Sequence, residues 1–230
     1  MGQSSSTPLH LPPNFLTSTL PRTYTVALKK SWTKLTAILT DPHSGFSFAA
    51  DWPEGYWSKL ILYNGPTKEY APLATAKPTG TMRKDFAITL PSISPHEPER
   101  TEIFRHGSSF SFKETYWFGF QVGYNAEKFE WRRSSGEEVW DAPGGGRFGW
   151  KLVRIGNGAG GEGYGITSDG MEVVAVWADY GLMSFSKIGT FEFRGSGATG
   201  ELGNMWSVMA IMSCLCVWQD QVRTVTAAAA

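Results

Sequence analysis

The sequence has few cysteines, few histidines and no excess of charge of either sign. Of its 230 residues, 2 are cysteine and 4 are histidine, while Lys+Arg and Asp+Glu number 21 each. Cys214 and Cys216 lie two positions apart in an apolar run, where helical geometry points them to different sides, so they cannot staple the fold. We therefore expect a reducing, cytoplasmic compartment. The balanced charge offers no field for a polyanion, and we predict no nucleic-acid partner.

Long hydrophobic runs and a secretory signal are also missing. The longest apolar run, Met205–Trp218, has 14 residues, or about 21 Å as a helix. A helix that spans a bilayer needs about 20 residues. The first part of the chain contains Pro8, Pro12 and Pro13 and has no continuous apolar stretch behind a basic start. We predict that the chain has no transmembrane span.

The motifs that would indicate an enzyme are incomplete. Gly156–Gly161 matches the spacing of a dinucleotide fingerprint, but Glu162–Gly165 cannot form the helix that must follow it. Gly144–Arg147 lacks the Lys-Ser/Thr of a phosphate loop. His106 is accompanied by no activated nucleophile pattern, and the histidines and cysteines fit no metal-ligand spacing. We predict a non-enzymatic protein without a metal or another cofactor.

Aromatic residues are abundant and make up 14% of the chain, with 10 Trp and 14 Phe, which is ample apolar surface for a core. After about residue 57, short apolar or alternating runs are each bounded by Gly, Pro, Asn or Asp, a pattern typical of antiparallel all-β domains. The predicted strands are Leu60–Tyr63, Phe86–Leu90, Thr101–Arg105, Ser109–Lys113, Thr115–Val122, Lys128–Arg133, Glu137–Trp140, Gly149–Ile155, Met171–Trp177 and Ser184–Phe193.

The apolar run near the C-terminus predicts a helix inside this β structure. Met205–Trp218 carries no charged residue on any face, and the chain turns polar at Gln219. A helix that is apolar all round is surrounded by protein or by lipid, and the length of this one excludes lipid. We therefore expect a central helix at residues 203–221 that is threaded through the sheet, with Thr199 as its N-cap.

These patterns divide the chain into four segments. Residues 1–22 are rich in Ser and Pro and are predicted to be a flexible tail. Residues 23–56 are a connecting segment, in which Tyr24–Leu39 fits either a strand or a short amphipathic helix. Residues 57–222 contain the β domain with its helix, and residues 223–230 are expected to be a frayed terminus.

Six segments of the chain carry a resemblance to a known family. They are Leu73–Ala76, Glu114–Gly119, Phe129–Arg133, Trp150–Arg154, Val173–Trp177 and Gly195–Gly203. They resemble a fungal group within the tubby C-terminal-like superfamily, which includes tubby proteins, phospholipid scramblases and LURP-one-related proteins. The resemblance covers about residues 57–222. It implies a mainly β fold, an antiparallel closed barrel of about 12 strands around a hydrophobic C-terminal helix, with phosphoinositide or membrane association as a family theme. It carries no ligand-binding residue over to this chain.

The first residues fit a lipidation signal. Met1–Ser6 matches the N-myristoylation pattern, in which Gly2 is exposed after removal of Met and a hydroxyl residue stands at position six. One myristoyl chain gives only marginal membrane binding, and Lys29, Lys30 and Lys34 form a thin basic cluster. We predict reversible, peripheral membrane contact through Gly2. The alternative is an ordinary disordered start.

Five basic residues on or next to adjacent predicted strands form a candidate anion-binding surface. They are Arg132, Arg133, Arg147, Lys151 and Arg154. If they cluster, anionic lipid headgroups or a protein partner are their natural ligands. Alternatively, they point outward along the strands and pair with Glu130, Glu137 and Glu138.

The sequence as a whole predicts a non-enzymatic, tubby-like binding or adaptor module that is peripherally associated with a membrane. Two alternatives stay open at this stage. A soluble carrier of a small molecule or lipid needs an empty interior, and a scramblase-like lipid-moving protein needs a segment that inserts into the membrane.

Overall fold

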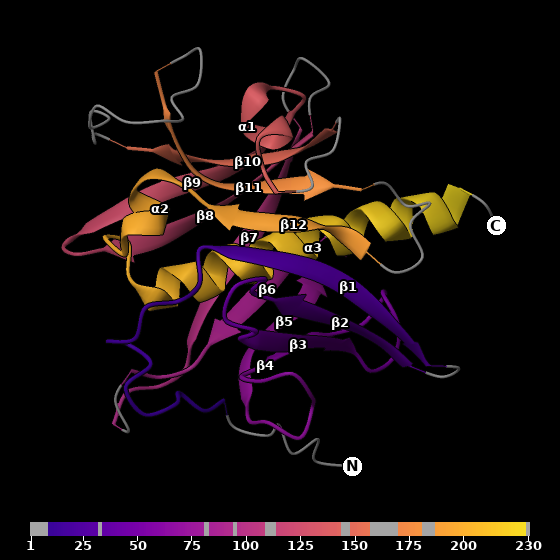
Figure 1. Ribbon diagram of the computed structural model, residues 1–230, viewed down its shortest axis with the longest axis horizontal. Coiled ribbons are helices and arrows are strands. Elements are labelled where there is room, and N and C mark those ends of the chain that lie inside the picture. The colour runs from indigo at the N-terminus through magenta and orange to yellow at the C-terminus, as the bar shows by residue number, and fades with distance from the viewer. Residues whose placement is uncertain are drawn as a thin grey trace.

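A computed structural model describes residues 9–31, 34–80, 83–93, 96–108, 114–143, 148–156, 170–180 and 187–228, and every structural statement below concerns these residues. In it, antiparallel strands β1 to β12 close into one barrel around the C-terminal helix (Figure 1). Each strand pairs with its neighbours in sequence, and the pairing of β1 with β12 closes the ring. The prediction of a mainly β, antiparallel closed barrel around a hydrophobic C-terminal helix is confirmed.

The elements have the following bounds. The strands are β1 (Thr23–Ser31), β2 (Lys34–Thr40), β3 (Ser47–Trp52), β4 (Leu60–Tyr63), β5 (Pro72–Thr79), β6 (Asp85–Leu90), β7 (Arg100–Ser108), β8 (Glu114–Val122), β9 (Asn125–Ser134), β10 (Phe148–Ile155), β11 (Glu172–Asp179) and β12 (Lys187–Phe193). The helices are α1 (Glu137–Trp140), α2 (Gly195–Thr199) and α3 (Asn204–Ala228).

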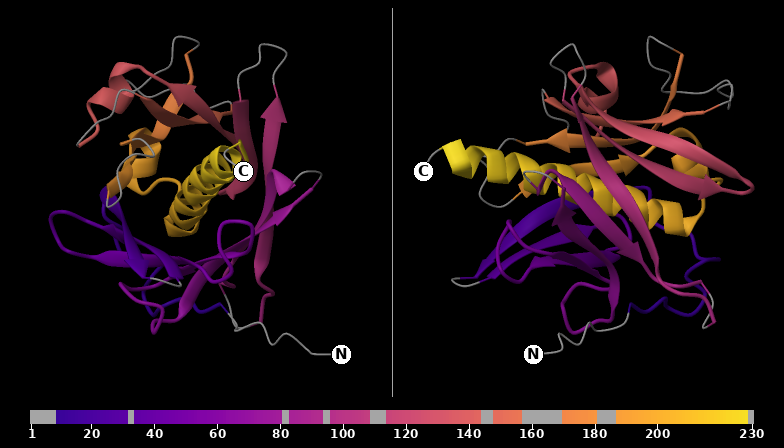
Figure 2. Two further views of the ribbon diagram at one scale, coloured as in Figure 1. Left: turned by 90° about the vertical axis from the view of Figure 1, so that its right-hand side faces the viewer. Right: turned by 180° about the vertical axis from the view of Figure 1, so that it is seen from behind.

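Helix α3 occupies the interior of the barrel, with strands on all sides of it (Figure 2). Every residue from Met205 to Asp220 is buried. The helix and the inner faces of the strands share one hydrophobic core, in which Trp131 of β9 and Trp206 of α3 are both fully buried. Apolar residues on every face of the helix are therefore explained by protein on every side.

Burial along the strands follows what covers them. In β6, buried residues alternate with half-buried ones, as expected for a strand with one face on the core and the other toward water. Strand β11 differs, because Val173–Ala178 is buried without interruption. Val139 of α1 packs outside the barrel against Val176 and Ala178, which gives β11 an apolar partner on its outer face as well.

The predicted start of the barrel at residue 57 is wrong. Residues 23–56, expected as a connecting segment, contain β1, β2 and β3, and β1 closes the barrel. In Tyr24–Leu39, which fitted either a strand or a helix, the described residues belong to β1 and β2, which pair in antiparallel fashion. Tyr24 and Val26 are fully buried and lie in the core. The closing partner β12 is more than 150 residues away in the sequence, so no local pattern indicates this pairing.

The helical boundaries also differ from the prediction. Thr199 ends α2 and does not cap α3. Gly200 (φ 82°) and Gly203 (φ 78°) have left-handed backbone between the two helices, which only glycine adopts readily. Helix α3 continues past residue 221 to Ala228, so residues 223–228 are not frayed. Glu137–Trp140, predicted as a strand, is the short helix α1.

Residues 9–22 lie across one end of the barrel, and we call them the strap. Phe15 is 5% exposed and belongs to the core, with Leu11 and Leu20 packed against the same core. The amide of Asn204, the first residue of α3, donates hydrogen bonds to the carbonyl oxygens of Phe15 and Ser18. The predicted flexible tail is therefore ordered from Leu9 onward in this structure. Residues 1–8 lie outside the described residues.

Candidate functional site

The barrel has two mouths with different chemistry. The strap and α2 lie at the end where α3 begins, and we call this end the strap mouth (Figure 1). At the other end the last turns of α3 emerge, and we call this end the polar mouth. It contains Arg133 and Glu114 from the strands and Asp220 and Arg223 from the helix.

Strands β9 and β10 place two of the predicted basic residues side by side. Lys151 lies directly opposite Arg132 in the ladder, and Arg133 lies opposite Trp150. Side chains alternate between the faces of a strand, so Arg132 and Arg133 point to different faces. Trp131 is buried in the core, which puts Arg133 on the inner side of the strand, at its end and therefore at the mouth.

Carboxylates accompany the basic residues of the outer wall. Arg132 Nε lies 2.8 Å from Glu130 Oε1, and Lys151 Nζ lies 3.0 Å from Glu138 Oε1. Burial opposes the charge on Glu130, but the hydrogen bonds from Arg132 and Lys128 outweigh it and lower the pKa of this carboxyl. These pairs agree with the second alternative from the sequence, in which the basic residues point outward along the strands and pair with glutamates.

Arg154 is held by a set of acidic residues. Its Nε and Nη2 lie 2.5 and 2.8 Å from the two oxygens of Glu127, and its Nη1 lies 2.9 Å from Glu201 Oε1. The hydrogen bond to Glu127 is the main reason that the pKa of Arg154 is raised. A guanidinium with this many carboxylate partners has few donors left for an added anion. The four basic residues described here therefore do not form one patch. Gly2, Arg147 and the glycine-rich segment at 157–161 lie outside the described residues.

Arg133 has the most open surroundings of the four. Its side chain is 61% exposed, and its Nη2 lies 3.8 Å from Glu114 Oε2, a longer separation than in the other pairs. Its guanidinium carbon lies 5.1 Å from the centre of the Trp150 ring. Stacking on an aromatic ring uses the face of the guanidinium and leaves its in-plane N–H groups to bind anions.

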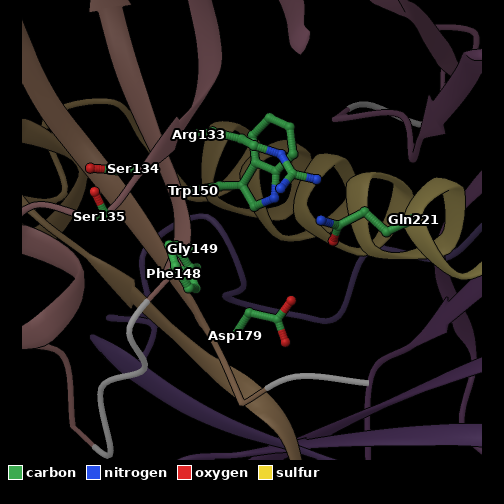
Figure 3. A pocket seen from close by; sticks show the side chains of 8 residues that line it. All are labelled: Arg133, Ser134, Ser135, Phe148, Gly149, Trp150, Asp179 and Gln221. Atoms are coloured by element: carbon green, nitrogen blue, oxygen red, sulfur yellow. The ribbon is translucent and has the colours of Figure 1, made fainter. Parts of the chain in front are cut away.

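Arg133 lines a small cavity at the polar mouth, which we call the Arg133 pocket (Figure 3). Its volume is about 190 Å³, and it is lined by Arg133, Ser134, Ser135, Phe148, Gly149, Trp150, Asp179 and Gln221. Figure 3 shows Arg133 over Trp150, with Gln221 reaching in from α3 and Asp179 across the cavity. Within the described residues, the buried Oε1 of Gln221 has no hydrogen-bond partner. The pocket thus offers the guanidinium of Arg133 and the acceptor oxygen of Gln221.

A buried polar network lies next to the pocket. The hydroxyl of Tyr116 lies 2.7 Å from Asp220 Oδ2 and 3.1 Å from Glu114 Oε1. Asp220 Oδ1 accepts a hydrogen bond of 2.6 Å from Arg223. Burial, followed by the charges of Asp220 and Glu114, raises the pKa of Tyr116 well above its usual value. Through Glu114 the network reaches both Arg133 and His106, whose Nε2 lies 3.5 Å from Glu114 Oε1.

Sequence reasoning missed Asp220 and Arg223 as members of this mouth. Asp220 and Arg223 are 3% and 2% exposed. Arg223 also stacks on Trp57 and Phe86, at 5.2 and 5.3 Å from their ring centres. Their spacing of three along a helix that was predicted to lie inside the barrel is a signal that could have indicated a buried pair. In the described part of the chain, Nε and Nη1 of Arg223 are buried without a partner.

The described residues contain no group of three or more His, Cys, Asp or Glu side chains that could hold a metal ion. No helix in this part of the chain combines the length and the apolar character needed to cross a membrane.

Comparison of the chain with protein-family models, curated proteins and solved structures finds no match. The resemblance to the tubby C-terminal-like superfamily therefore stays a prediction.

Proposed function

We propose that the chain is a non-enzymatic, tubby-like binding or adaptor module. It attaches peripherally to a cytoplasmic membrane surface through an N-myristoyl group on Gly2, and the Arg133 pocket binds an anionic lipid headgroup there. The observation that carries this proposal is the filled interior of the barrel. Because Met205–Asp220 is buried on all sides, a ligand has to bind at the outer wall or at a mouth.

The Arg133 pocket is the part of the surface best suited to an anion. The guanidinium is supported on one face by Trp150, and its carboxylate contact to Glu114 is long. Phosphate and carboxylate groups bind guanidinium in its plane with two parallel hydrogen bonds. We take phosphatidylserine as the headgroup to test, because its phosphate and its carboxylate can each bind the guanidinium of Arg133 in this way.

The filled interior also weighs against the carrier alternative. A lipocalin-like carrier holds its ligand in the barrel, where this chain has Trp206, Met209 and Met212, each fully buried in the core. Helix α3 would have to leave the barrel before a ligand of useful size could enter.

Flotation with vesicles tests the headgroup site. Chain made without acylation is mixed with vesicles of phosphatidylcholine alone or with added phosphatidylserine. We expect Arg133→Gln to lose about fivefold of the binding that phosphatidylserine adds, because one basic residue near an anionic surface contributes about 1 kcal/mol. Arg132→Gln is the matched control, since it removes the same charge at the neighbouring position on β9, which faces the outer wall. Equal losses in the two variants contradict a specific site at Arg133.

Labelling with azido-myristate tests the anchor. The wild-type chain and Gly2→Ala are expressed in cells with the label, and the membrane fraction of each is measured. We expect label on the wild type alone, together with a loss of membrane signal in Gly2→Ala. Membrane fractionation that does not change in the variant contradicts the anchor.

A further inference from the structure

A second cavity, larger than the Arg133 pocket, lies between the strap and the segment that follows β6. The strap lies on the opposite side of the molecule from α1 (Figure 1). We call it the strap groove. Its volume is about 680 Å³, within the range of about 300 to 1,000 Å³ that is usual for small-molecule sites. Its apolar lining consists of Leu9, Leu11, Pro12, Phe15, Leu16 and Ile93.

The strap groove exposes large aliphatic side chains to water. Leu16 is 44% exposed and Ile93 is 58% exposed, although both border the same cavity. Leu9 and Leu11 are half-buried beside them. Apolar surface in contact with water is unfavourable by about 25 cal/mol for each Å², so an apolar occupant that covers these side chains is stabilised there.

The strap begins at the rim of this groove. The N–H of Leu9 donates a hydrogen bond of 3.0 Å to Glu99 Oε1, and the N–H of His10 donates one of 2.9 Å to the carbonyl of Pro72. These two bonds fix the strap where it enters the described part of the structure. Gly2 precedes Leu9 by seven residues, which extend at most about 25 Å. A group attached to Gly2 is therefore within reach of the groove.

We propose that the strap groove is a binding site for the myristoyl chain carried by Gly2. This inference rests on the proposed acylation of Gly2 and adds a second position for the acyl chain, buried in the protein instead of inserted in a membrane. Each buried methylene contributes about 0.8 kcal/mol in either place, so the two positions compete closely. An acyl chain in the groove keeps the protein off the membrane, and release of the chain allows attachment.

Charges at the rim select the form of the lipid. Glu97 and Glu99 both line the groove, and their charges disfavour the carboxylate of a free fatty acid. A myristoyl group linked to Gly2 as an amide carries no charge at that position. The groove therefore suits the acyl group of the chain better than a free fatty acid.

The test uses a myristoylated peptide with the sequence of residues 2–8 and a fluorescent label at its C-terminus, titrated into the full chain carrying Gly2→Ala. We expect saturable binding, and we expect Ile93→Glu to weaken it about tenfold or more, because the change puts a charge against the acyl chain. Val225→Glu is the matched control: Val225 is 51% exposed and lies on α3 beyond the polar mouth, so binding should not change. The proposal is wrong if the peptide binds equally well without its acyl group. It is also wrong if the Ile93→Glu variant binds the acylated peptide as well as the parent chain does.

A second arm separates this inference from the proposed anchor. Here the chain with Gly2 intact is acylated, with and without Ile93→Glu. The variant should show a larger fraction bound to phosphatidylcholine vesicles than the wild type, and its azido-myristate labelling should be the same. If azido-myristate does not label the wild-type chain, Gly2 carries no acyl group. That result contradicts the membrane anchor, and it also means that the strap groove does not hold an acyl group of this chain. Labelling together with no binding of the acylated peptide contradicts the groove alone.

Discussion

The two mouths of the barrel differ in the kind of interaction that closes them. At the strap mouth, a terminal segment packs Phe15 into the core and is held to the start of α3 by Asn204. At the polar mouth, the helix that fills the barrel supplies Asp220 and Arg223, which are fixed to each other and to Tyr116 of the wall. We expect the strap to open without disturbing the barrel, because residues 9–22 are not part of the strand ladder. A change at the polar mouth is expected to move α3, because Asp220 and Arg223 belong to that helix. Reversible burial of a lipid chain suits the first mouth, and a rigid headgroup site suits the second.

The largest effect is expected from breaking the buried ion pair of the polar mouth. Asp220→Ala leaves the charge of Arg223 buried without its partner, which should lower the free energy of unfolding by about 3 to 5 kcal/mol. Urea unfolding measures this loss. The double variant Asp220→Leu with Arg223→Met is the control, because replacing both partners by apolar residues is often close to neutral. A loss of less than about 1 kcal/mol in Asp220→Ala would show that the pair does not hold this mouth together.

Phe15→Ala tests the strap mouth in the same way. Removal of a buried phenylalanine side chain costs about 3 kcal/mol or more, but here the loss should be local, because residues 9–22 are not part of the strand ladder of the barrel. We expect faster amide hydrogen exchange at His10 and Ser18 with unchanged exchange in α3. Leu16→Ala, at a residue that is 44% exposed, is the control. Global destabilisation by Phe15→Ala would mean that the two mouths are coupled.

High pH should weaken the polar mouth, where Tyr56 packs against Trp218 of α3 and Tyr116 binds Asp220. Burial raises the pKa of Tyr56 to about 12, and it raises the pKa of Tyr116 further. The folded protein therefore favours the neutral phenols. The contribution of these phenols to the free energy of unfolding is complete below the ordinary tyrosine pKa of about 10. It is lost as the pH rises through about 12. Tyrosinate absorbance should rise together with unfolding. Tyr56→Phe should move the unfolding transition to higher pH. An unchanged transition would contradict the ionisation of Tyr56 as a cause of unfolding.

The smallest effect is expected where the strap meets α3. Asn204→Ala removes the two hydrogen bonds to the carbonyls of Phe15 and Ser18, which should cost about 1 kcal/mol. Urea unfolding with exchange at Ser18 as the local probe measures it. Thr224→Ala, at an exposed position near the other end of α3, should stay within about 0.5 kcal/mol. Equal effects of the two variants would contradict a role for Asn204 in holding the strap.

The sequence predicted the parts of the fold that depend on local pattern. The apolar run Met205–Trp218 indicated a helix inside the barrel, because no other environment suits it. The continuation of the helix beyond residue 221 to Ala228 was missed, since Arg223 and the residues after it look like an exposed end. Arg223 is buried because it pairs with Asp220 and lies over Trp57 and Phe86, which are distant in the sequence.

The candidate site was predictable by residue type and not by position. Arg132 and Arg133 are neighbours with the same chemistry, and the sequence gives no reason to prefer one. The structure separates them, because Arg132 faces the outer wall beside Glu130, whereas Arg133 stands at the end of β9 over Trp150. In the same way, Glu137–Trp140 looks like a strand, but it forms the short helix α1, whose Val139 packs against Val176 and Ala178 of β11.

The headgroup site can be tested by NMR, with the indole and side-chain amide signals of the ¹⁵N-labelled chain followed while a water-soluble, short-chain phosphatidylserine is added. We expect saturable shifts of the Trp150 indole and the Gln221 amide at the Arg133 pocket, with the buried indoles of Trp131 and Trp206 unchanged. Shifts of the Trp131 and Trp206 signals would mean that the ligand enters the barrel and would favour a carrier. No shift at Trp150 or Gln221 would contradict the headgroup site.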